Sequence, residues 1–146
     1  MKRKGKAIMW ILIVLGVLVA AMGVGIIATA PGRQELKGMT FPATAFTSLA
    51  QGTYVGEYKG AKDSFRNEKV QVTVTDGKVS GIKVLEGSVI KEGKPNDIGK
   101  GMTIDDLSGK VIDAQSLHVD VISGATLTSN AHLKAIENAL AQAGSK

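Results

Sequence analysis

One short segment near the carboxyl end of the chain carries the residues best suited to hold a phosphorylated ligand. The range Asp120–Ser129 reads Asp-Val-Ile-Ser-Gly-Ala-Thr-Leu-Thr-Ser and leads into a pattern of helical period. Gly124 and Ala125 have little or no side chain, so a bulky ligand can approach the backbone there. The unpaired amides and positive dipole end of the following helix favour an anion, and Thr126 places a hydroxyl at that point. The segment therefore indicates a phosphate site.

Two later hydroxyl residues leave the interpretation open. Thr128 and Ser129 can either cap the start of the helix or hydrogen-bond to phosphate oxygens. Taken alone, the segment also fits an ordinary capped helix that follows a tight turn and binds nothing.

The rest of the chain offers few other groups for chemistry. Without cysteine, the 146 residues can form no disulfide, thiolate metal site, iron–sulfur cluster or c-type haem linkage. Two histidines are too few for a histidine metal site; we expect His118 on a strand surface and His132 in solvent near the start of the last helix. No metal site, triad or paired-carboxylate site is predicted. Redox chemistry would need a cofactor held by other means.

The net charge of +5 is concentrated at the amino end. Lys2, Arg3, Lys4 and Lys6 are four of the 18 Lys and Arg residues, which leaves 14 against 13 Asp and Glu in the whole chain. A nearly neutral domain has no basic face, so we do not expect nucleic acid binding.

The amino end has the pattern of a membrane anchor. Residues 7–27 include no charge, and apolar character continues to Ala30. About 24 residues at roughly 1.5 Å each span roughly 36 Å, enough for a hydrocarbon core of roughly 30 Å. The preceding cations are expected to stay in the cytoplasm, so residues 31–146 would face outward from a single-pass protein of the cell membrane. A cleaved signal peptide is the alternative, because Ala28-Thr29-Ala30 has the small residues of a cleavage site.

The chain thus divides into three predicted parts. Residues 1–30 would be the basic tail and anchor, residues 31–50 a linker, and residues 51–143 one outer domain. The linker is inferred from its prolines, glycine and scattered Thr and Ala.

The outer domain begins with strand patterns. Residues 52–58, 68–75 and 78–85 alternate or are rich in β-branched residues, and Asp76-Gly77 predicts a two-residue hairpin turn. That turn pairs Val74 with Val79, yet the next apolar residues have the opposite parity. We therefore predict a bulge near Ser80-Gly81.

Helix patterns follow a glycine-rich loop over 86–101. Thr103 is a predicted N-cap with Asp106 three residues later, residues 117–122 are a predicted short strand, and the last helix is expected over Thr128–Gln142. Strands followed by helices predict an α+β fold: a small antiparallel sheet packed with helices, preceded by one N-terminal transmembrane helix.

The segment Asp120–Ser129 also resembles the flavinylation motif of the FMN-binding domain family. That motif is Asp, two residues, Ser or Thr, Gly, Ala, and a Thr or Ser that receives FMN; every position is matched. Gly-Thr-Tyr at 52–54, Val-x-Val-x-Asp-Gly-Lys-Val at 72–79 and Ala-Gln-Ser at 114–116 are similar to the stand-alone form of the domain. One departure is that some relatives have Glu-Thr-Pro-Gly-x-Gly near the flavin, whereas the nearest stretch here is Lys94–Gly101.

The resemblance implies how a cofactor would be held. Thr126 Oγ would be joined to the phosphate of FMN by a phosphoester bond, made by a separate flavin transferase that uses FAD and Mg²⁺. Gly124 and Ala125 would serve recognition and close approach, and Asp120 would be read by the transferase. The other expected cofactor-binding residues are Ser123, Thr128 and Ser129.

The resemblance also implies a function. The chain would be a membrane-anchored, extracytoplasmic electron carrier, a redox module rather than a stand-alone enzyme, with a membrane quinone oxidoreductase or another flavoprotein as partner. Two alternatives stay open: a subunit of a membrane redox complex, and a non-redox membrane-tethered binding domain that has kept the fold.

Overall fold

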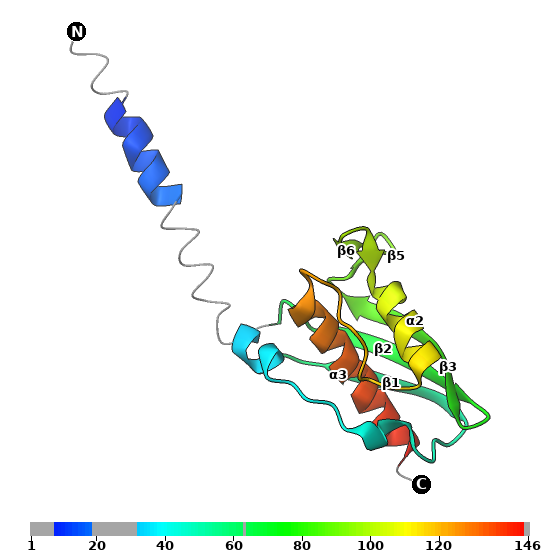
Figure 1. Ribbon diagram of the computed structural model, residues 1–146. Coiled ribbons are helices and arrows are strands. Elements are labelled where there is room, and N and C mark those ends of the chain that lie inside the picture. Colours follow the sequence, from blue (N-terminus) through cyan, green and yellow to red (C-terminus); the bar gives the residue numbers. More distant parts are fainter. Residues whose placement is uncertain (1–7, 19–31, 63, 145–146) are drawn as a thin grey trace. The chain divides into compact units, whose positions relative to one another are not determined.

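The computed structural model describes residues 8–18, 32–62 and 64–144 (Figure 1). The chain separates into two compact units, Met1–Pro31 and Gly32–Lys146. In the first unit the described residues 8–18 are helical. No helix among the described residues has both the length and the apolar character needed to cross a membrane. Most of the predicted anchor, residues 1–7 and 19–30, lies outside the described residues.

The second unit is built on a three-stranded antiparallel sheet. Its strands are β1 (Gly52–Tyr58), β2 (Glu68–Thr75) and β3 (Lys78–Gly87), with β2 in the centre. Along β2, buried residues alternate with partly exposed ones, and the three valines at 70, 72 and 74 are almost completely buried. A period of two gives the sheet one apolar face. The predicted α+β class is confirmed.

The predicted irregularity in the β2–β3 hairpin is confirmed. Both residues of the turn 76–77 have positive φ, as a two-residue hairpin turn requires. Val74 pairs with Val79, and the next pair along skips Ser80. The skipped residue restores the parity that buries the later apolar residues of β3. A second irregularity, which we did not predict, skips Leu85.

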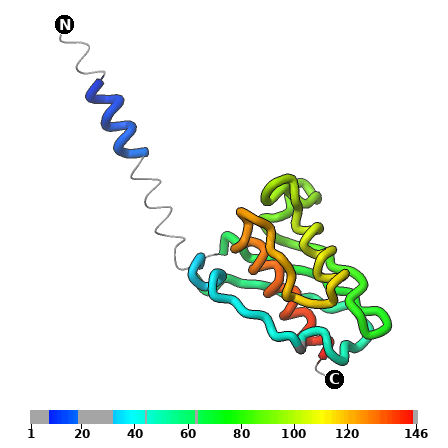
Figure 2. Tube along the Cα trace, viewed as in Figure 1, coloured from blue at the N-terminus to red at the C-terminus, as the bar shows by residue number. Residues whose placement is uncertain are grey.

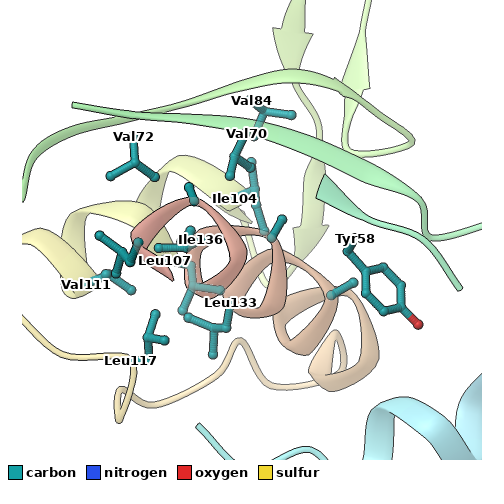
Figure 3. Packing of buried hydrophobic residues seen from close by; sticks show 14 of the residues in the cluster. Tyr58, Val70, Val72, Val84, Ile104, Leu107, Val111, Leu117, Leu133 and Ile136 are labelled. Atoms are coloured by element: carbon teal, nitrogen blue, oxygen red, sulfur yellow. The ribbon is translucent and has the colours of Figure 1, made fainter. Parts of the chain in front are cut away.

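Two helices cover the apolar face of the sheet. They are α2 (Ile104–Ala114) and α3 (Thr126–Ala143), and Figure 1 shows both on the same side. In Figure 3, side chains of α2, among them Ile104 and Leu107, and of α3, among them Ile136, gather beneath Val70 and Val72 of β2. This layer between sheet and helices is the hydrophobic core.

The start of α2 is as predicted. The carboxylate of Asp106 accepts hydrogen bonds from the backbone amide of Thr103 at 2.6 Å and from its hydroxyl at 3.1 Å. These two bonds hold the pKa of Asp106 below its usual range.

The predicted strand over 117–122 is wrong. This stretch contains no strand residue and pairs with no strand among the described residues. Its backbone has other partners: the amide of Ile122 donates to Ser129 Oγ at 3.2 Å, and Lys110 Nζ donates to the carbonyl of Asp120 at 3.3 Å. At Val79 of β3, the side-chain amide of Gln115 bonds both the N–H and the carbonyl, at 2.9 and 2.8 Å.

The predicted loop over 86–101 is only partly irregular. It contains two small hairpins, formed by β4 (Ile90–Lys91) with β5 (Lys94–Pro95) and by β6 (Asp97–Gly99) with β7 (Met102–Thr103). Glycines there supply the turns between strands too short to show an alternating pattern.

The segment 32–50, which we expected to be a linker, packs on the domain instead. It contains a helix over 32–37 and a 3₁₀ helix, η1 (Ala43–Phe46). Leu36 and Leu49 are buried in the core, and Asn130 Nδ2 of α3 donates to the carbonyl of Leu36 at 2.8 Å. Figure 2 shows this cyan stretch following α3 towards its carboxyl end. Met39, Phe41, Ala45 and Phe46 of the same segment also pack against the core and are partly buried.

His132, expected in solvent, is completely buried. Its Nδ1 bonds Glu68 at the start of β2, and its Nε2 lies 2.8 Å from Ser108 Oγ of α2. The residue occupies the inward stripe of α3, between Ser129 and Ile136, where buried polar groups must find partners. A polar network thus joins three elements inside the core.

Candidate functional site

The predicted phosphate segment forms a turn at the amino end of α3. The amide of Ala125 donates to the carbonyl of Ile122 at 2.9 Å, which closes the turn through Ser123 and Gly124. Gly124 has a φ of 85°, a left-handed conformation that glycine adopts without steric cost. Ser123 and Gly124 are exposed, whereas Ala125 is buried beneath them. The backbone of Ser123 and Gly124 is therefore accessible to a ligand, while the buried Ala125 holds the turn in place.

Thr126 is the first residue of α3, two residues earlier than we predicted for the start of this helix. Its side chain is exposed beside the exposed Ser123–Gly124 turn. The first amides of a helix lack carbonyl partners one turn earlier, and the 18-residue α3 has no acidic residue in its first turn. An anion on the Thr126 hydroxyl would meet N–H donors and a favourable dipole.

The remaining predicted residues have different positions. The N-cap is Ala125, so neither Thr128 nor Ser129 caps the helix as we had allowed. Thr128 is half-buried; Ser129 is fully buried, and its hydroxyl accepts the Ile122 amide from behind the turn. This placement makes Ser129 a brace for the turn. Asp120 is exposed at the other end of the segment.

A neighbour of the turn that the sequence did not reveal is Gly99 of the β6–β7 hairpin. A Cβ added to Gly99 would lie 2.9 Å from the carbonyl oxygen of Ser123 and 3.5 Å from Ile122 Cγ2. The hairpin is held by Asp97, whose carboxylate accepts the amides of Gly99 at 2.8 Å and Gly101 at 3.0 Å. Only a residue without a side chain lets this wall approach the turn so closely. The Asp-x-Gly-x-Gly spacing over residues 97–101 was the sequence feature that could have indicated this tight hairpin.

An open groove borders the same segment. Its volume is about 530 Å³, and it lies between the second half of α2 and residues 118–120. The lining residues come from these two stretches: Lys110, Asp113, Ala114, His118, Val119 and Asp120. Asp120 is therefore shared between the groove and the motif, so a molecule that reads the motif would meet mixed charges here.

A family model described as the FMN-binding domain matches residues 66–141. The chain belongs to the FMN-binding domain family. The match runs from the end of the β1–β2 loop almost to the end of α3, and includes both the turn at 123–125 and the hairpin around Gly99.

The site of this FMN-binding domain fits a flavin phosphate. A phosphate ester at Thr126 would lie at the helix end where negative charge is favoured, and the exposed glycine turn leaves the backbone accessible. The neighbouring hairpin lies against this turn at Gly99. The predicted cofactor FMN agrees with the family, and attachment through Thr126 stays a prediction.

Proposed function

We propose that this FMN-binding domain carries its FMN covalently on Thr126 and transfers electrons outside the cytoplasm. The observation that carries the proposal is the exposed hydroxyl at the amino end of α3, inside a segment that the family model covers. Exposure matters because a separate enzyme would have to reach this hydroxyl. The positive end of the helix then lowers the free energy of the phosphodiester anion that results.

The attachment step is a group transfer from FAD. Thr126 Oγ forms a bond to the phosphorus on the riboflavin side of the pyrophosphate, and the bridging bond from that phosphorus to the AMP oxygen breaks. AMP leaves, and the hydroxyl proton passes to a base of the transferase or to solvent. The flavin transferase and its Mg²⁺ supply the activation. This chain supplies the hydroxyl and an open turn.

The chain's residues then hold and orient the product. Bound FMN supplies electron transfer, and the protein supplies its position and electrostatic surroundings. Ser129 fixes the turn from behind through the Ile122 amide, and Gly99 sets the distance of the adjacent hairpin. Covalent attachment prevents loss of the cofactor in a compartment from which free flavin diffuses away.

The proposed location rests on the amino-terminal sequence. Four cations precede a long stretch without charge, an arrangement typical of a retained anchor with its carboxyl side outside the cytoplasm. A membrane quinone oxidoreductase or another flavoprotein would then be the redox partner. This assignment makes the protein a carrier between other enzymes.

Intact-protein mass tests the attachment. The full chain is co-expressed with a flavin transferase, and we expect an added mass of FMN less one water on Thr126, with flavin fluorescence that survives denaturing electrophoresis. Thr126→Ala should lose both signals. Thr53→Ala is the matched control, because this threonine is exposed on β1, outside the motif, and it should keep them.

Two results would contradict the proposal. Fluorescence that survives in Thr126→Ala would place the bond elsewhere. A wild-type chain without flavin, while the transferase modifies another substrate in the same cells, would favour a binding domain without redox function.

A further inference from the structure

The loop between β1 and β2 exposes an aromatic side chain that the flavin site does not use. Phe65 is 65% exposed, whereas the next most exposed large apolar residues described in the second unit, Val55 and Leu85, are 44% and 41% exposed. Those two lie within sheet strands, whereas Phe65 lies in the loop 59–67. An aromatic ring exposed at a loop, close in sequence to basic residues, is a pattern found where proteins meet membrane interfaces.

Basic residues share the loop with this ring. The guanidinium carbon of Arg66 lies 5.2 Å from the centre of the Phe65 ring, within the range of a cation–π contact. Among the described residues, Arg66 Nε and Nη1 are buried without a hydrogen-bond partner. Lys59 and Lys62 of the same loop are exposed, although Lys59 also pairs with Glu57 at 3.2 Å.

The helix over 32–37 adds to this surface and fixes its position. Glu35 Oε2 accepts the amide of Ala61 at 3.2 Å, which joins the helix to the loop. The helix is itself secured through the buried Leu36 and its bond from Asn130. In the sequence of helix and loop together, with Glu57, five basic residues stand against three acidic ones: Arg33, Lys37, Lys59, Lys62 and Arg66 against Glu35, Glu57 and Asp63.

Sequence continuity indicates what could cover the ring. The helix 32–37 follows directly after the apolar stretch that ends at Ala30. The loop is therefore bonded to the first part of the domain that a membrane anchor would meet. A ring that can enter the acyl boundary, among cations that attract phosphate headgroups, is suited to the surface of an anionic bilayer.

We propose that Phe65, with the exposed Lys59 and Lys62 of the same loop, contacts the headgroup region of an anionic phospholipid bilayer. The contact orients the domain on the membrane. The inference rests on the membrane anchor of the proposed function but not on the flavin.

Tryptophan quenching tests the contact in the full chain. The single native tryptophan is first removed by Trp10→Phe. One new tryptophan is then introduced by Phe65→Trp. Val55→Trp and Leu85→Trp are the matched controls, because both positions are exposed but lie on the sheet. Each protein is reconstituted into vesicles of phosphatidylcholine and phosphatidylglycerol that carry brominated acyl chains.

We expect the tryptophan at 65 to be quenched at least about twofold more than either control, since bromine quenches only close to the acyl region. Quenching at 65 should fall when phosphatidylglycerol is omitted, and also in a Lys59→Glu, Lys62→Glu variant. Equal quenching at 65, 55 and 85 would overturn the proposal. So would emission at 65 that depends on protein concentration and not on lipid, which would indicate an interface between copies.

The added mass of flavin on the chain is measured in the same samples, so the lipid contact and the flavin attachment can fail separately. Quenching at 65 without flavin keeps the lipid contact and rejects the flavin assignment. Flavin on Thr126 without quenching at 65 keeps the flavin assignment and rejects the lipid contact.

Discussion

The buried pair of His132 and Glu68 gives the most quantitative prediction. Both side chains are almost inaccessible, at 0% and 2% exposed, and they join α3 to the start of β2. Replacing His132 with Leu roughly keeps the volume but removes the partner from a buried carboxyl group. Removing one partner of a buried pair costs about 3–5 kcal/mol of unfolding free energy, because the remaining group stays desolvated.

The third member of the network should add little to that cost. Ser108 Oγ loses its contact to His132 at 2.8 Å but can still donate to the carbonyl of Ile104 at 3.2 Å. A domain is stable by only about 5–15 kcal/mol, so a loss of about 3–5 kcal/mol is roughly a fifth of that stability or more. With a urea slope of about 1–3 kcal/mol per molar, a loss of about 4 kcal/mol lowers the midpoint by roughly 2 M.

Urea unfolding of the full chain in mild detergent, followed by far-ultraviolet circular dichroism, measures this loss. The double variant Glu68→Leu, His132→Leu is the essential comparison, because an apolar pair leaves neither polar group buried without its partner and should regain most of the stability. A single variant that loses less than about 1 kcal/mol would refute the reasoning, since that is the cost of an ordinary neutral hydrogen bond. A double variant as unstable as the sum of the two single ones would refute it as well.

Three further predictions follow from contacts at other positions. Gly99→Ala should slow flavin attachment about tenfold or more by pushing the hairpin off the motif turn, while Gly109→Ala, which meets nothing within 4 Å, should not; time courses of intact mass measure both. Gly56→Ala should lower the unfolding free energy by about 1–3 kcal/mol or more, because the new Cβ would lie 2.0 Å from a backbone oxygen of α3; urea midpoints against Gly109→Ala measure it. The hydrogen bonds from Thr103 lower the pKa of Asp106 in the folded chain. Its contribution to stability is therefore full above the ordinary pKa of 3.8 and is lost as pH falls through the lower folded pKa. Asp106→Asn should remove this acid dependence from the unfolding free energy measured as a function of pH.

Local chemistry explains which parts of the fold the sequence predicted well. The bulge at Ser80 followed from the parity of neighbouring apolar residues, and the start of α2 followed from Thr103 and Asp106. Each depends on residues a few positions apart, whose conformational preferences act within one turn or one hairpin. The motif turn was also found this way, since Gly124 and Ala125 announce it.

The features that were missed depend on distant partners. Residues 117–122 have a strand-like alternation, but their backbone bonds the side chains of Ser129 in α3 and Lys110 in α2. Histidine is a residue type that is often exposed, so the sequence around His132 does not show that it is buried. Its partner Glu68 lies 64 residues away in the chain. Gly99 gains its importance from Ser123 across the site. No local pattern encodes such contacts.

The hydrogen bond from Asn130 to the carbonyl of Leu36 has a mechanical consequence. Asn130 lies one helical turn beyond Thr126. Its hydrogen bond therefore holds the stretch from Gly32 to Leu36 beside the end of α3 that presents the Thr126 hydroxyl. These five residues therefore belong to the folded domain and add nothing to the length of any tether that precedes it. Residues inserted to give the attachment site a longer reach would have to precede Gly32.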